Sequence, residues 1–182
     1  LINRILSVLI EEYSFLNSYG HFSPNSLLMQ LEIISRLPST KSTKPPILCI
    51  HGAYNHAWCW DKYFLPYFAQ AGYPAYALSL RGHGNSAGAN RLYWASLADY
   101  VHDVAQVSQN LAQPPILLGH SMGGMIVQKY WEAHHSHPAA ILMASVPPYG
   151  LWSPSVYLAF QDPELLWQLN LIQFFGLQFV TP

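Results

Sequence analysis

The sequence predicts an α/β fold: a mostly parallel sheet with helices on both faces, in three α/β/α layers, followed by a helical cap segment. Short apolar segments alternate with segments of helical periodicity from residue 47 to residue 144. Strands that are nearly continuous apolar runs are typical of parallel strands buried on both faces. One such strand leads directly into a Gly-x-Ser-x-Gly turn and then a helix at 115–124, which favours the same class.

The expected elements follow in a regular order. Residues 27–37 predict a strand, half of an early hairpin, and the Pro/Ser/Thr/Lys-rich residues 38–46 predict a solvated loop. Continuous apolar segments predict buried strands at 47–50, 75–80, 115–119 and 139–144. Apolar residues at helical spacing predict helices at 57–70, 96–112 and 122–134. Pro66 is expected to kink or break the first of these helices.

Both ends of the chain differ from this central part. Apolar residues at helical spacing between Ile2 and Tyr13 predict an amphipathic helix that packs on the domain. A signal peptide is disfavoured, because Arg4 is a lone positive charge and no small-residue cleavage site follows. After Pro147-Pro148 an aromatic-rich sequence predicts two or three short helices. We therefore expect a partial core at residues 1–146 and the start of a helical cap at residues 147–182.

Composition restricts the classes of partner. Hydrophobic residues make up 51% of the 182 residues and charged residues 9%, against roughly one quarter charged in ordinary soluble domains. Such a chain must bury much of itself or present apolar surface to a ligand, a lipid or a missing segment. The net charge of −1, without a basic cluster, excludes a nucleic-acid partner. No apolar run reaches 18 residues, so no membrane span is predicted.

The two cysteines, Cys49 and Cys59, are too few for a disulfide framework. We expect both to be free structural thiols, which fits a reducing compartment and a cytoplasmic location. Cys and His lack the paired spacing of a zinc site, so no metal is expected.

The turn at Gly119-His120-Ser121-Met122-Gly123 indicates chemistry. A strand that runs straight into a helix forces the corner residue into a strained conformation and exposes its side chain. Backbone N–H groups and the positive end of the helix dipole then favour an oxyanion beside the Ser121 hydroxyl. The alternative interpretation is a tight turn with a serine as helix N-cap.

Three motifs, in this order and each after a strand, carry a family resemblance: His51-Gly52, Arg81-Gly82-His83-Gly84-Asn85-Ser86 and Gly119-His120-Ser121-Met122-Gly123-Gly124. Over about residues 27–182 the chain resembles the α/β-hydrolase superfamily, and most of all its esterases, lysophospholipases and monoglyceride-lipase-like enzymes.

The resemblance implies roles for the residues of these motifs. Ser121 would be the nucleophile of a nucleophile elbow, and the backbone N–H groups of Ala53 and Met122 would form the oxyanion hole. Five residues would support the site: His51, Gly52, Gly119, His120 and Gly123.

Six further positions have expected roles. The resemblance implies that Arg81 and His83 order the loop after the second predicted strand. His102 and Asp103 are expected on a solvated helix face. Trp58 and Trp60 could wall an acyl pocket or simply pack a core helix; both alternatives stay open.

A serine nucleophile also needs a base and an acid. The histidines after Ser121 are His134, His135 and His137, and a helical rise of about 1.5 Å per residue puts His134 about 20 Å from the hydroxyl. We therefore expect the acid and the histidine beyond Pro182, in the last strands of the fold. The chain begins with Leu1 rather than Met, so we also expect residues missing upstream. Strand 139–144 would then be a bare apolar edge.

The resulting hypothesis is a serine hydrolase of apolar or lipid-like carboxylic esters. It would act through an acyl-enzyme on a small-molecule ester, without a cofactor, and this fragment alone would show negligible turnover. Two alternatives remain: a non-catalytic binding or scaffold protein on the same fold, and a related chemistry such as that of haloperoxidases, C–C hydrolases or acyltransferases. The sequence assigns no oligomeric state.

Overall fold

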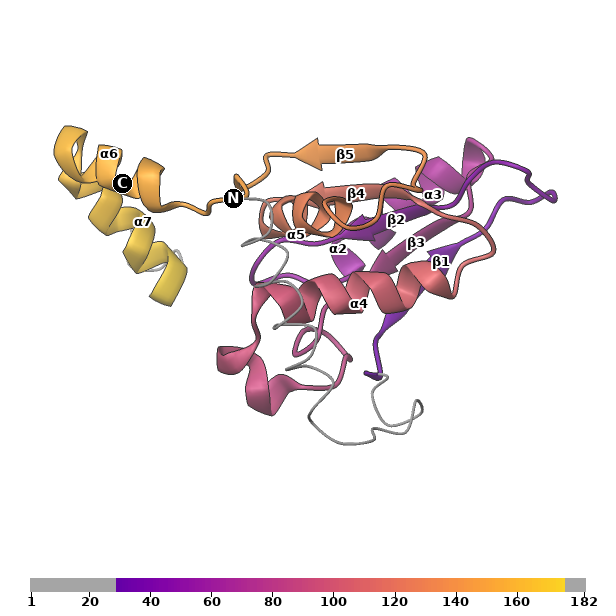
Figure 1. Cartoon of the computed structure of the whole chain (residues 1–182), viewed down its shortest axis with the longest axis horizontal. Helices are drawn as coiled ribbons and strands as arrows, with labels where there is room; N and C mark the ends of the chain where they lie inside the picture. Colours follow the sequence, from indigo (N-terminus) through magenta and orange to yellow (C-terminus); the bar gives the residue numbers. More distant parts are fainter. Residues whose placement is uncertain (1–28, 176–182) are drawn as a thin grey trace, which may run out of the picture.

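A five-stranded sheet forms the centre of the molecule (Figure 1). The structure, a computed structural model, describes residues 29–175. The strands have the order β1-β3-β2-β4-β5, and all neighbouring pairs are parallel except β1 and β3. They are β1 (Ile33–Arg36), β2 (Ile47–Ile50), β3 (Ala75–Leu78), β4 (Ile116–His120) and β5 (Ala140–Met143). This sheet confirms the predicted α/β class.

The register of the sheet brings the ends of three strands together. Ile50 of β2 pairs with Leu78 of β3 on one side and with Gly119 of β4 on the other. Parallel strands share a carboxyl edge, and ligands of open α/β sheets bind outside that edge. The loops that follow β2, β3 and β4 therefore meet in one place.

Helices cover both faces of the sheet, as predicted. The helices α4 (Leu97–Gln109) and α5 (Met122–Trp131) share a core with Leu48 and Ile50 of β2. On the other face, α2 (Trp58–Asp61) and α3 (Phe64–Gln70) share a core with Ile47 and Cys49. Successive residues of β2 thus alternate between the two cores, because side chains of a strand point to opposite faces.

Some local predictions are wrong in detail. The first strand, β1, does not form a hairpin with β2, the next strand in the sequence. It pairs antiparallel with β3 instead. The predicted helix at 57–70 is two helices, and the break lies at residues 62–63 rather than at Pro66. Pro66 is the third residue of α3, where a backbone N–H would have no helical partner, so proline is tolerated there.

A short 3₁₀ helix, η2 (Ala89–Trp94), was not expected from the sequence. It leads into α4, whose start is fixed by a capping box: the Ser96 hydroxyl accepts from the Asp99 N–H, and the Asp99 carboxylate accepts from the Ser96 N–H. This arrangement satisfies two N–H groups at the helix start.

The last described elements are α6 (Trp152–Gln161) and α7 (Pro163–Phe175), which agree with the expected short helices. They contact each other and project beyond the end of the sheet (Figure 1). Strand β5 lies at the sheet edge, with Ile141 43% and Leu142 45% exposed, as predicted for an apolar edge. The domain boundary at residue 146 stays a prediction, and the helix expected near Ile2–Tyr13 lies outside the described residues.

Candidate active site

Ser121 occupies the corner between β4 and α5 with φ 54° and ψ −118°, a conformation that residues other than glycine rarely adopt. Its N–H donates to the Met143 carbonyl at 3.0 Å, and its carbonyl accepts from the N–H of Val146 at 3.1 Å. Such strain persists only where the surroundings hold it in place. The half-buried Ser121 hydroxyl has no hydrogen-bond partner among residues 29–175, so it is available to a ligand.

Two glycines make this corner possible. A Cβ at Gly119 would lie 2.6 Å from the carbonyl carbon of Gly123, and a Cβ at Gly123 would lie 2.5 Å from the carbonyl oxygen of His51. Both contacts are far too short, and both are with backbone atoms that cannot simply rotate away. Glycine is therefore required at both positions for the close approach of β4, α5 and the end of β2.

The loop after β2 lies directly against Ser121. A Cβ at Gly52 would come within 3.0 Å of the Ser121 Cβ and 3.1 Å of His120 Nδ1. Ala53, the next residue, is exposed. Within the described part of the chain, neither the Ala53 N–H nor the Met122 N–H donates to another group. Both amides belong to residues on segments that adjoin Ser121, and their role as an oxyanion hole stays a prediction.

His51 ties this loop to β3. Its ring is completely buried, Nδ1 lies 2.7 Å from the Gly52 carbonyl, and Nε2 lies 3.0 Å from the Leu80 N–H. Because the Leu80 N–H can only donate, Nε2 must accept, so the proton is on Nδ1 and the ring is neutral. Burial lowers the pKa of His51 to about 4, against the opposing effect of the hydrogen bond to Gly52.

The expectation that Asp103 lies on a solvated helix face is wrong, because Asp103 is completely buried. Its carboxylate accepts from the Arg81 N–H at 2.9 Å, from Nε at 3.0 Å and from Nη2 at 2.7 Å, while Arg81 Nη1 donates to Asp99 at 2.5 Å. The sequence held a signal: Asp103 shares helical spacing with the buried Tyr100 and Val107. His102, in contrast, is exposed as expected.

The ion pair fixes the loop after β3, in agreement with the ordering role expected for Arg81. His83 also contributes: its Nδ1 lies 3.0 Å from the Arg81 carbonyl, and its ring is 5.0 Å from the ring of His51. The loops after β2 and β3 are therefore one connected unit beside Ser121.

Glu32 supports the same edge, and sequence reasoning missed it. Its carboxylate accepts from the Ser79 hydroxyl at 2.6 Å and from Asn85, and the Ser79 hydroxyl accepts from the Ala57 N–H at 2.9 Å. The hydrogen bonds from Ser79 and Asn85 hold the pKa of the Glu32 carboxyl below its ordinary value, against the effect of burial. A lone Glu within the predicted strand 27–37 gave no indication of these partners.

Trp58, Trp60 and His120 differ in how far they are buried. Trp60 is 3% exposed and contacts Phe64 edge-on at 5.0 Å, so core packing is the correct alternative for it. Trp58 is 53% exposed and lies 5.6 Å from the His56 ring. His120 is exposed next to Ser121.

The histidines after Ser121 lie at the opposite edge of the sheet. His137 Nδ1 is 3.0 Å from the carbonyl of Pro115, which precedes β4, whereas Ser121 follows β4. The His134 ring stacks on the Tyr130 ring near the end of α5, with the ring centroids 4.1 Å apart. Glu132 pairs with Lys129, and Asp162 accepts from the Leu165 N–H at the start of α7. None of these groups reaches the hydroxyl, in agreement with the helix-rise argument.

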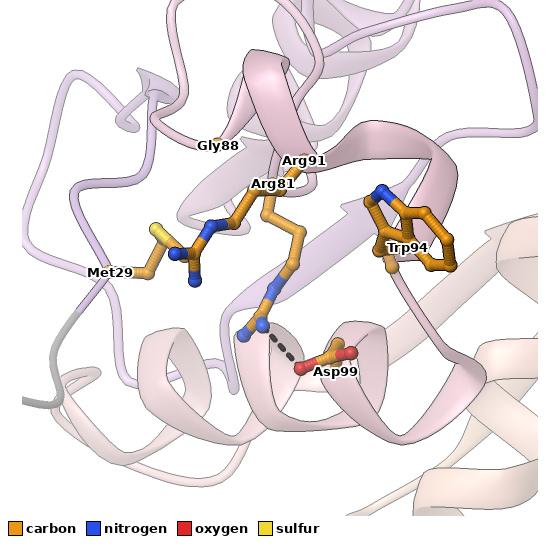
Figure 2. Close-up of a pocket in the computed structure, with 7 residues that line it drawn as sticks. Met29, Arg81, Gly88, Arg91, Trp94 and Asp99 are labelled. Atoms are coloured by element: carbon orange, nitrogen blue, oxygen red, sulfur yellow. Dashed lines mark hydrogen bonds and ion pairs between the residues drawn. The ribbon is translucent and has the colours of Figure 1, made fainter.

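A cavity of about 220 Å³ is lined by Arg81 and by residues of η2 and α4 (Figure 2). The Arg81 side chain reaches Asp99, while that of Arg91 extends toward Met29. All three guanidinium nitrogens of Arg81 are occupied by Asp99 and Asp103. The lining residues do not include Ser121 or the loop after β2, so this cavity is separate from Ser121.

Two negative findings apply to residues 29–175. No helix there is both long enough and apolar enough to cross a membrane. No group of three or more His, Cys, Asp or Glu side chains in that part of the chain could hold a metal ion.

Comparisons with known proteins agree with this geometry. A family profile described as serine aminopeptidase, S33 (Hydrolase_4) matches residues 41–170. A pyrethroid hydrolase of Sphingobium wenxiniae is 35% identical over 96 residues, which cover 53% of this chain and 32% of the relative. A monoacylglycerol lipase of Mycolicibacterium smegmatis is 32% identical over 103 residues, which cover 54% of this chain and 36% of the relative.

The chain thus spans about a third of the length of these curated relatives. A solved monoacylglycerol lipase of Paleococcus ferrophilus has the same fold, with a TM-score of 0.57 and 21% identity over 74% of this chain and 53% of the other.

Proposed function

The chain belongs to the serine aminopeptidase S33 family of α/β hydrolases, and from this membership we propose that it carries the nucleophile of a serine hydrolase. The substrate would be a carboxylic ester with an apolar or lipid-like acyl group. The reaction would proceed through an acyl-enzyme on Ser121. The observation that supports this most strongly is the strained Ser121 backbone at φ 54°, with a hydroxyl that no described residue occupies.

The first chemical step follows from the position of the corner. The Ser121 oxygen would attack the ester carbonyl carbon, and the carbonyl oxygen would become an oxyanion. The N–H groups of Ala53 and Met122 would donate to that oxyanion, and the positive end of α5 would stabilise its charge. The alcohol would leave as the tetrahedral intermediate collapses, and water would later release the acid.

The proton of Ser121 must pass to a base within about 3 Å. Among residues 29–175 no imidazole lies that close, so we propose that the base and its orienting acid come from outside this part of the protein. The whole protein would then be active, while the 182-residue chain alone would show negligible turnover.

The type of substrate is proposed from the relatives and from the apolar surface of the helices that follow β5. Two curated relatives are named pyrethroid hydrolase and monoacylglycerol lipase, and from these names we propose an apolar ester as the substrate. The exposed aromatic side chains of α6 and α7, among them Tyr157, Phe160 and Trp167, offer apolar surface on the segment that follows β5. Such side chains are typical of walls around apolar ligands.

The test is hydrolysis of a series of p-nitrophenyl esters by the whole protein and by its Ser121→Ala variant. We expect turnover that rises with acyl length and falls by about 10³-fold or more in Ser121→Ala. Ser136→Ala, at the exposed opposite end of the domain, is the matched control and should leave turnover unchanged. A folded whole protein without turnover would contradict the proposal and favour a binding protein; turnover that survives Ser121→Ala would exclude Ser121 as nucleophile.

A further inference from the structure

The segment that leaves β5 holds both backbone polar groups of Ser121. We call residues 143–146 the β5 exit segment. The Met143 carbonyl accepts from the Ser121 N–H at 3.0 Å, and the Val146 N–H donates to the Ser121 carbonyl at 3.1 Å. The Ser121 carbonyl also accepts from the Gly124 N–H at 3.0 Å within α5, so the β5 exit segment adds to the hold of the helix, and its Met143 carbonyl is the acceptor for the Ser121 N–H.

The β5 exit segment is itself strained. Ala144 has φ 42°, in the left-handed region that L-residues other than Asn, Asp and Gly rarely occupy. A residue in such a conformation needs surrounding contacts to keep it there. The segment therefore cannot hold Ser121 unless something holds the segment.

The side chain of Gln128, in α5, supplies contacts to this segment. Its Nε2 donates to the Ser145 hydroxyl at 2.9 Å, to the Val146 carbonyl at 3.1 Å and to the Gly124 carbonyl at 3.2 Å. The two N–H bonds of the amide are thus shared among three acceptors on α5 and the exit segment. Gly124 permits this approach, since a Cβ there would lie 2.6 Å from the Ser145 Cβ.

We propose that Gln128 is a positioning residue for the nucleophile, an inference that rests on the proposed function of Ser121. Its amide locks the β5 exit segment onto α5, and the segment in turn locks the Ser121 backbone. Met122, whose N–H is a proposed oxyanion donor, follows Ser121 directly and moves with it. Because displacements of about 1 Å at a reacting group can cost about 100-fold in rate, Gln128 acts on catalysis without touching the substrate.

Gln128→Glu tests this with almost no change of shape. The carboxylate has no N–H and would face the Gly124 and Val146 carbonyl oxygens, which can only accept, so it should release the exit segment. In the whole protein we expect kcat to fall about 10- to 100-fold, with KM changed less than about threefold. Gln109→Glu, exposed on α4, makes the same chemical change away from the site and should leave both constants unchanged.

Two comparisons exclude a merely structural role. Val107→Ala weakens the core on α4, and at an equal decrease in Tm it should leave kcat nearly unchanged. Gln128→Met removes the N–H groups without adding charge and replaces Gln128→Glu if that variant does not fold. A kcat within twofold of the original in a folded Gln128 variant, or a loss equal to that of Val107→Ala, would overturn the proposal.

Amide hydrogen exchange tests, independently of activity, whether Gln128 holds the β5 exit segment in place. In Gln128→Glu the Ser121 and Val146 amides should exchange at least about tenfold faster, while the Cys49 amide in β2 should keep its rate. Unchanged exchange at Val146 would overturn the proposal even in an active enzyme. Faster exchange at Val146 in a protein that hydrolyses no ester would support the hold of Gln128 on the β5 exit segment and would contradict the proposed function instead.

Discussion

The two halves of the carboxyl edge of the sheet differ sharply. Around β2, β3 and β4, the buried His51 ring is hydrogen-bonded to Gly52 and Leu80, and the buried Asp103 carboxylate is paired with Arg81. At β5 and beyond, apolar side chains such as Leu142, Phe160 and Trp167 are exposed. The first half contains Ser121, the proposed nucleophile, and the proposed oxyanion donors. Beside the second half, no base or acid among residues 29–175 reaches the Ser121 hydroxyl. We call the half around β2, β3 and β4 the finished side and the half at β5 the unfinished side. We expect the free energy of unfolding to depend mainly on the finished side.

The largest effect is expected from Asp103→Ala on the finished side. Removing the carboxylate leaves the Arg81 guanidinium without its main partner in a buried site, which should lower the free energy of unfolding by about 3–5 kcal/mol. Urea unfolding followed by circular dichroism measures this. Glu132→Gln breaks the exposed pair with Lys129 and should cost at most about 1 kcal/mol. Equal losses in the two variants would contradict the difference between a buried and an exposed ion pair.

His51 should make the same side sensitive to acid. Burial lowers its pKa from an ordinary value of 6.5 to about 4, so the unfolded chain binds a proton at a pH where the folded ring does not. The stabilising effect is therefore present above pH 6.5 and is lost as the pH falls from 6.5 toward 4, by about 3 kcal/mol. Unfolding free energies across this range, compared with those of His51→Gln, check the expectation. The same slope in both proteins would exclude His51 as the cause.

Gly123→Ala tests the corner itself. The new methyl group would lie 2.5 Å from the His51 carbonyl oxygen, so either α5 or the loop after β2 must move. Overpacking of this kind costs about 1–3 kcal/mol, and we expect ester turnover in the whole protein to fall further than stability explains. Thermal unfolding and turnover are measured together. An active, equally stable Gly123→Ala protein would show that the close approach is unnecessary.

The smallest effect is expected on the unfinished side. Leu142 is 45% exposed on the edge strand, so Leu142→Lys should change the free energy of unfolding by no more than about 0.5 kcal/mol. A charge on a bare edge should also reduce aggregation, which light scattering would detect. A loss above about 1 kcal/mol would indicate that β5 is covered in solution and would remove the contrast between the two halves.

The predictable part of the fold came from local patterns. Continuous apolar runs located β2 and β4, and Gly-x-Ser-x-Gly located the corner at Ser121, because both depend on neighbours in sequence. The errors concern partners that are distant in sequence. Asp103 seemed a surface residue until Arg81 provided its counter-charge, and Glu32 has no recognisable pattern because its partners Ser79 and Asn85 come from another loop. The pairing of β1 with β3 was missed for the same reason.

The strained corner is proposed to make Ser121 a nucleophile. Labelling of the whole protein with a fluorophosphonate, followed by peptide mapping, tests it most directly. We predict a single phosphonylated residue, Ser121, with labelling abolished in Ser121→Ala and retained in Ser136→Ala. A folded protein that remains unlabelled at Ser121, or that is labelled elsewhere with the same rate in Ser121→Ala, would contradict the claim.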